Sequence, residues 1–173
     1  MRYIRVISGV VAALAFAATA SAGSIEDKAH VTVGGAESSD VTVAIDISEK
    51  AFHITKGGTD RGITLMAGMP AVMQLRNRDL VAHEFVSTLF RDVPFRMSGN
   101  ATLVKAARAS GVRVDPGQTV TLEFDAPMAK EDQYGALESS YDVFWCNVHG
   151  KDHGHKMRGE LVIIETRGEI GGG

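Results

Sequence analysis

The chain has 173 residues, with 18 lysines and arginines against 21 aspartates and glutamates, so its formal net charge at pH 7 is −3. The phosphates of a nucleic acid would repel a protein of this charge, which argues against a nucleic-acid partner. The single cysteine excludes a framework of disulfides within the chain and leaves one thiol that is buried, reactive or bound to a metal.

The first 22 residues have the layout of a secretory signal peptide. Two arginines lie within the first five residues, an apolar run covers residues 6–18, and the Ala-Ser-Ala at 20–22 is a cleavage site of the A-x-A kind. The apolar run is shorter than the roughly 20 residues that a membrane-spanning helix needs. We therefore predict cleavage after residue 22, export to a periplasm or the cell exterior, and no membrane span in the mature chain.

Strand-like patterns begin after a polar segment, residues 23–40, which we predict to be a flexible N-terminal arm. In a strand every second side chain lies on the same face, so alternating apolar and polar residues predict a half-buried strand. Two such strands are predicted, with these residues on their buried faces: Val41, Val43, Ile45 and Ile47 in the first, and Ala71, Met73 and Leu75 in the second. The β-rich run 82–90 predicts another.

The segment 92–111 has a different pattern. Its apolar and small residues Leu103, Ala106, Ala107 and Ser110 follow a helical period, and Gly111 could end a helix. We predict a short helical insertion in this segment, with an irregular excursion as the alternative.

Strand signals resume after an Asp-Pro-Gly turn at 115–117, with alternation over 119–125. The polar run 130–140 is predicted to be a surface loop, and the apolar runs 141–145 and 159–165 are predicted to be the last strands. Short strands separated by turns are typical of an antiparallel β-sandwich or barrel, here with about seven or eight strands. We predict one all-β domain over residues 41–165, followed by a flexible tail at 166–173.

The most informative stretch lies between the last two predicted strands. It begins with the only cysteine, Cys146, ends with Met157, and includes three histidines: His149, His153 and His155. A closed zinc site would use more thiolates or a complete Cys/His set, whereas one thiolate, two imidazoles and a weak thioether suit copper. Such a copper site needs a histidine from elsewhere in the chain, and His83, at the start of a predicted strand, is the best placed. A buried cysteine and a half-buried histidine without a metal are the simpler alternatives.

The residues that carry this chemistry resemble those of a known family. The stretch FWCNVHGKDHGHKMRGELVI resembles the C-terminal ligand loop of the cupredoxins, the blue-copper proteins, and LRNRDLVAHEF and VDPGQTVTLEF resemble two further parts of that fold. The resemblance covers residues 41–165 and implies a Greek-key β-sandwich that binds one copper ion. The longer loop is also similar to that of nitrosocyanin, a red-copper relative.

The resemblance implies copper ligands at His83, Cys146, one loop histidine and Met157. His149 follows the cysteine as in plastocyanin-type loops and is our first choice, with His153 and His155 as alternatives. Spacing alone does not fix the histidine, nor whether the site is blue, green or red.

The function that we predict is one-electron transfer with an unidentified redox partner protein. Two alternatives stay open: a periplasmic copper-handling or tolerance protein, and a cupredoxin that oxidises ferrous iron for an iron-uptake system. Met66, Met69 and Met73 bear on copper handling because thioethers bind Cu(I). Packing of these methionines in the core is the simpler interpretation, since Met73 belongs to an alternating buried face.

Overall fold

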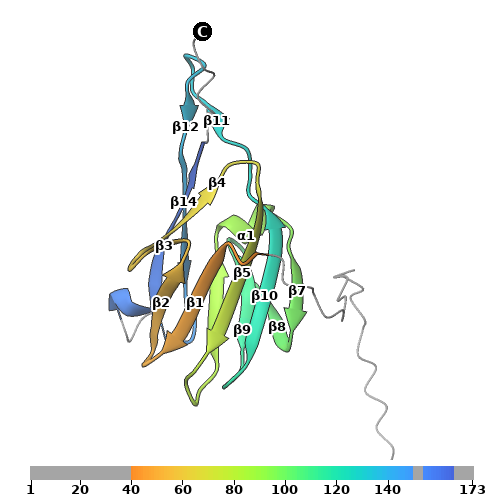
Figure 1. Ribbon diagram of the computed structural model, residues 1–173, viewed down its shortest axis with the longest axis vertical. Helices are drawn as coiled ribbons and strands as arrows, with labels where there is room; N and C mark the ends of the chain where they lie inside the picture. Colours follow the sequence, from red (N-terminus) through yellow and green to blue (C-terminus); the bar gives the residue numbers. More distant parts are fainter. Residues whose placement is uncertain (1–39, 150–153, 166–173) are drawn as a thin grey trace, which may run out of the picture.

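The structure is a computed structural model that describes residues 40–149 and 154–165. In this part of the chain two β-sheets form two layers, with a short two-stranded ribbon at one end (Figure 1). The predicted signal peptide, all but the last residue of the predicted arm, the predicted tail and His153 lie outside the described residues.

One sheet has five strands. Their order across the sheet is β2 (Ala51–Lys56), β1 (Val43–Ser48), β5 (Pro70–Asn77), β10 (Thr119–Asp125) and β7 (Arg96–Gly99). The predicted alternation accounts for its inner face, because Val43, Ile45 and Ile47 of β1 and Ala71, Met73 and Leu75 of β5 are all buried. Val41 precedes β1 and is only half-buried.

The other sheet has seven strands, and the predicted metal loop, residues 146–157, lies between two of them in the chain. Their order is β3 (Gly58–Thr59), β4 (Gly62–Met66), β14 (Arg158–Ile164), β13 (Ser140–Trp145), β6 (His83–Ser87), β9 (Ser110–Val114) and β8 (Ala101–Lys105). The ribbon consists of β11 (Lys130–Glu131) and β12 (Leu137–Glu138), which lie in the predicted surface loop.

Aromatic rings join the two layers in the core. Phe52 of the first sheet meets Phe85 and Phe144 of the second edge to face, with ring centroids 5.7 and 5.6 Å apart. Phe85 and Phe144 stack on each other with centroids 5.0 Å apart. Because such pairs hold rings in preferred geometries, this cluster fixes how β6 and β13, the strands next to the metal loop, sit against the other sheet.

The predicted helix is in the wrong place. Within residues 40–149 and 154–165 the one α-helix is the short α1 (Leu89–Asp92), whereas residues 101–114 form the hairpin of β8 and β9. Gly111 does not end a helix: a Cβ there would lie 1.9 Å from the carbonyl oxygen of Phe85, so glycine allows β9 to pair closely with β6. Pairing with two neighbouring strands outweighs the helical spacing of a few small side chains.

The strand prediction also needs correction. The described residues form fourteen strands rather than seven or eight; three of these, β3, β11 and β12, have only two residues each. The sheets are mixed rather than antiparallel, since β1 pairs with β5, and β4 with β14, in parallel. The prediction of an all-β sandwich with a small helix is confirmed. No helix within the described ranges is long and apolar enough to cross a membrane.

Candidate metal centre

Three potential ligands meet at one end of the seven-stranded sheet: His83, Cys146 and His149. Nδ1 of His83 lies 3.1 Å from Nδ1 of His149, and Sγ of Cys146 lies 4.0 and 3.8 Å from those two nitrogens. The point equidistant from the three atoms is about 2.1 Å from each, within the roughly 2.0–2.3 Å that nitrogen and thiolate ligands keep from zinc. The three donors are therefore spaced for a single metal ion of the first transition row.

Strand pairing fixes two of the three donors. His83 is the first residue of β6, and Cys146 directly follows β13, which pairs with β6. The N–H of Cys146 donates to the carbonyl oxygen of Met157, so the two ends of the metal loop are tied together at 2.9 Å. The N–H of Glu84 donates to Sγ of Cys146 at 3.4 Å, a contact that would stabilise a thiolate. His83 and Cys146 are completely buried, whereas His149 is half-buried.

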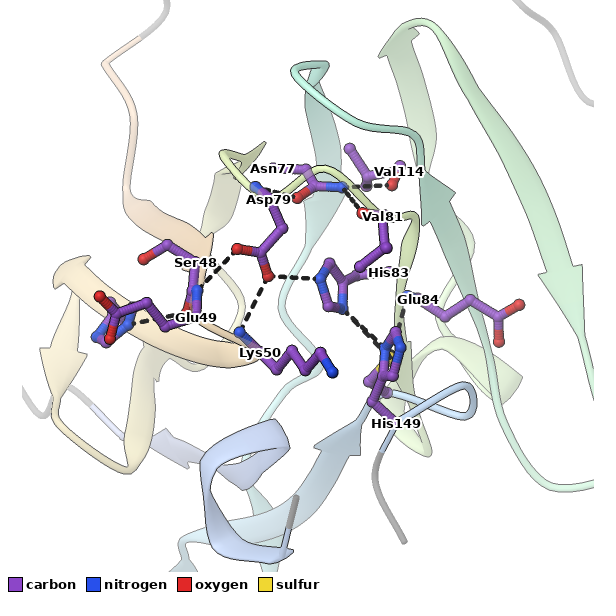
Figure 2. Close-up of polar contacts among 12 residues, drawn as sticks. Ser48, Glu49, Lys50, Asn77, Asp79, Val81, His83, Glu84, Val114 and His149 are labelled. Carbon is purple, nitrogen blue, oxygen red and sulfur yellow. Dashed lines mark hydrogen bonds and ion pairs between the residues drawn. The ribbon is translucent and has the colours of Figure 1, made fainter. Parts of the chain in front are cut away.

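A carboxylate orients the imidazole of His83 (Figure 2). Nε2 of His83 lies 2.8 Å from Oδ2 of Asp79, and a carboxylate can only accept, so Nε2 carries the proton and Nδ1 faces the other donors with its lone pair. Burial raises the pKa of Asp79, but hydrogen bonds from the N–H groups of Lys50 and Glu49 and the contact with His83 lower it more. The pKa of Asp79 therefore lies below its ordinary value of 3.8.

The loop that carries Asp79 is built around the buried side chain of Asn77. Its Nδ2 donates to the carbonyl oxygens of Val81 and Val114 at 2.8 and 3.0 Å, and its Oδ1 accepts from the N–H of Asp79 at 3.0 Å. One amide thus joins the end of β5, the loop before β6 and the end of β9 (Figure 2).

The remaining predicted ligands are placed as follows. Met157 ends the short 3-10 helix η1 (Gly154–Met157) and is completely buried, with its carbonyl oxygen bonded to Cys146. His155 also lies in η1, but its side chain is outside what the structure describes, as is the whole of His153.

Sequence reasoning missed the residues that support the donors. Asp79 precedes His83 by four residues, and this spacing is a signal in hindsight, because a histidine that binds metal usually gives its other nitrogen to a carboxylate or carbonyl. Nothing in the sequence indicates that the N–H groups of Glu49 and Lys50 bind that carboxylate, since these residues are about 30 positions away.

The chemistry of the donor set agrees with its geometry. Two ring nitrogens only 3.1 Å apart need a proton or a cation between them, because two lone pairs facing each other repel. A thiolate with two imidazoles is the in-plane set of a type 1 copper site, and His83, Cys146 and His149 could form one. The cluster is compatible with one copper ion.

Comparison with known proteins gave matches only among solved structures. No protein-family model matches the chain, and no curated protein matches it significantly. The chain is similar to the McoA multicopper oxidase of the hyperthermophile Aquifex aeolicus, at 12% identity and a TM-score of 0.48, over 76% of this chain but only 31% of the oxidase. It is also similar to a Cu(I) form of an amicyanin variant, at 15% identity and a TM-score of 0.41, over 74% of this chain and 87% of amicyanin. Amicyanin is a cupredoxin.

Proposed function

We propose that this protein binds one copper ion through His83, Cys146 and His149 and transfers single electrons. The observation that carries the proposal is the triangle of two imidazole nitrogens and one sulfur, with sides of 3.1, 3.8 and 4.0 Å, at the buried end of a β-sheet. When bound, copper would supply the Cu(II)/Cu(I) couple. The protein supplies donors that keep their places in both oxidation states.

Each residue has a separate part in this proposal. Cys146 provides the thiolate, and the N–H of Glu84 stabilises its negative charge. His83 provides a fixed imidazole from a strand end, and His149 provides a second from the loop. Met157 is buried and its carbonyl oxygen accepts from the N–H of Cys146; in this proposal its thioether would be a weak fourth ligand that adjusts the potential.

The setting that we propose is the periplasm or cell exterior, after removal of residues 1–22. The electron enters or leaves through the half-buried ring of His149, since His83 and Cys146 are completely buried and cannot touch another protein. The partner is a redox protein that docks over this end of the sheet.

The test is a titration of the metal-free mature protein with Cu(II), followed by visible absorption and electron paramagnetic resonance. We expect an intense thiolate-to-copper band that saturates at one equivalent and disappears in Cys146→Ser. Among the alanine variants of His149, His153 and His155, we expect only the first to abolish the band. His53→Ala is the matched control, because His53 is an exposed histidine of β2. A colourless complex, or a band that survives in Cys146→Ser, would refute the proposed site.

One observation favours copper handling as a second candidate function. Met73 is completely buried, as predicted, but Met66 and Met69 do not pack in the core and are 40% and 53% exposed. Met128, 74% exposed, reaches over Gly68, between these two residues in the chain. Met66 pairs with Ile164, at the end of β14 away from Cys146, and exposed thioethers in this region are suitable donors for a second, soft Cu(I) ion.

Copper stoichiometry separates the two functions. An electron carrier should bind one copper in either oxidation state. A copper-handling protein should bind additional Cu(I) in the Cys146→Ser variant and lose it when Met69 and Met128 are changed to leucine. Replacing Met97, a half-buried methionine of β7, serves as the control.

A further inference from the structure

The contact between Asp79 and His83 satisfies a hydrogen-bond donor and also places a negative charge next to a proposed copper ligand, on the side of the ring away from the other donors. Oδ2 of Asp79 lies 2.8 Å from Nε2 of His83, the nitrogen opposite the one that faces Cys146. The carboxylate is only 17% exposed and the imidazole is completely buried, so water screens their interaction weakly.

A strained turn holds the carboxylate in this position. Ser48 and Ala51 pair across the β1–β2 hairpin, so Glu49 and Lys50 form a two-residue turn, and both have a φ of 53°. Positive φ at both positions is the pattern of a type I′ turn, which usually contains asparagine and glycine. Here two residues with long side chains adopt it, and both of their N–H groups point at Asp79, at 2.8 Å to Oδ1 and 3.0 Å to Oδ2.

The parts connect in a line from the turn to the metal loop. Figure 2 shows Asp79 between the Glu49 and Lys50 backbone and the ring of His83, with His149 on the far side of that ring. The turn belongs to the five-stranded sheet and His83 to the seven-stranded sheet, so Asp79 fastens the imidazole across the two layers. Oδ1 of Asn77 accepts from the N–H of Asp79, which leaves the carboxylate little freedom to move.

From this arrangement we propose that Asp79 is the positioning residue of His83 and that its charge favours the oxidised metal. The proposal rests on the proposed copper site. Reduction adds one electron from a partner and moves no proton, because Nε2 keeps its hydrogen in both states. A negative charge hydrogen-bonded to the ligand stabilises Cu(II) more than Cu(I), since the oxidised ion carries the larger positive charge. Asp79 therefore lowers the reduction potential.

The first experiment compares the potentials of copper-loaded variants. Asp79→Asn keeps an acceptor oxygen but loses the charge, and we expect the ratio of Cu(II) to Cu(I) affinity to fall at least tenfold, which raises the potential by about 59 mV or more. Asp46→Asn is the matched control, because it also removes one carboxylate. That carboxylate belongs to β1 and pairs with Arg78, which follows β5, rather than with a proposed ligand. The control should change the ratio less than twofold, about 18 mV by the same conversion. Equal potentials in Asp79→Asn and wild type would overturn the proposal.

The second experiment needs no copper and uses the metal-free wild-type protein. Histidine labelled with nitrogen-15 reports by nuclear magnetic resonance which ring nitrogen carries the proton, and we expect the Nε2–H form for His83. An Nδ1–H form would overturn the positioning role, even if Asp79→Asn failed to fold. If the wild-type chain bound no copper, the proposed function would fail, and with it the effect on the potential, whereas this spectrum would still decide whether Asp79 orients His83.

Discussion

Replacing Asn77 by alanine should destabilise the protein more than any exposed polar substitution. The side chain is buried and makes three hydrogen bonds, to Val81, Val114 and Asp79. A hydrogen bond contributes about 1 kcal/mol net, and partners that stay buried without one add to the loss, so we expect Asn77→Ala to lower the free energy of unfolding by about 3 kcal/mol. With a slope of about 2 kcal/mol per M of urea, the midpoint would fall by about 1.5 M.

The assay is urea denaturation of the metal-free protein, followed by circular dichroism and by the fluorescence of the only tryptophan, Trp145. Asn100→Ala, at an exposed position between β7 and β8, is the control and should change stability by less than about 0.5 kcal/mol. Asn77→Asp should be at least as harmful as alanine, because it points an oxygen at two carbonyl oxygens. If Asn77→Ala matched the Asn100 control, the role assigned to the buried amide would be wrong.

Three further changes test the fold and its charges. Gly111→Ala should cost about 2 kcal/mol or more in urea denaturation, because the new Cβ would meet the carbonyl oxygen of Phe85, whereas Gly62→Ala has room and should cost far less. Phe52→Ala should cost about 3–5 kcal/mol in thermal denaturation, since it removes the ring that joins the two sheets; a loss near 1 kcal/mol would contradict that role. The pKa of Asp79 is lower in the folded than in the unfolded protein, so its ionised carboxylate stabilises the metal-free fold at pH values above the unfolded-state pKa. This contribution is lost as the pH falls through the folded-state pKa. The stability gap between wild type and Asp79→Asn should therefore narrow between about pH 5 and pH 2, and a constant gap would contradict the prediction.

Much of the sandwich could be predicted because a strand with one buried face has alternating apolar and polar residues in its sequence. This alternation is clear in β1 and β5, and also in β10, where Val120, Leu122 and Phe124 are buried as predicted. The alternation is weak in β8, where Leu103 and Val104 are both only half-buried. The spacing of small residues in this segment therefore suggested a helix instead. A strand near the edge of a sheet buries little, and its sequence therefore says little about its structure.

The donors of the candidate site could also be predicted from the sequence, whereas the residues that support them could not. Residue type and position indicated Cys146, His83 and His149, because a thiol and imidazoles at strand ends have few other uses together. The support around them depends on contacts between distant parts of the chain, such as that of the Glu49 and Lys50 turn with Asp79. A turn with two positive φ values at a glutamate and a lysine contradicts local preference, so no reading of the local sequence would find it.

The three donors differ in burial: two are buried at strand ends and held rigidly, and the third is partly accessible from the surface. His83 and Cys146 lie at the ends of paired strands, have no exposed surface, and are held by Asp79 and by the N–H of Glu84. His149 lies on the loop that follows and keeps part of its ring near the surface. Electron transfer, the function that we propose, needs donors that do not rearrange when the charge changes, and also one donor that a partner can approach. Here strand pairing meets the first need with two donors, and the loop meets the second with the third.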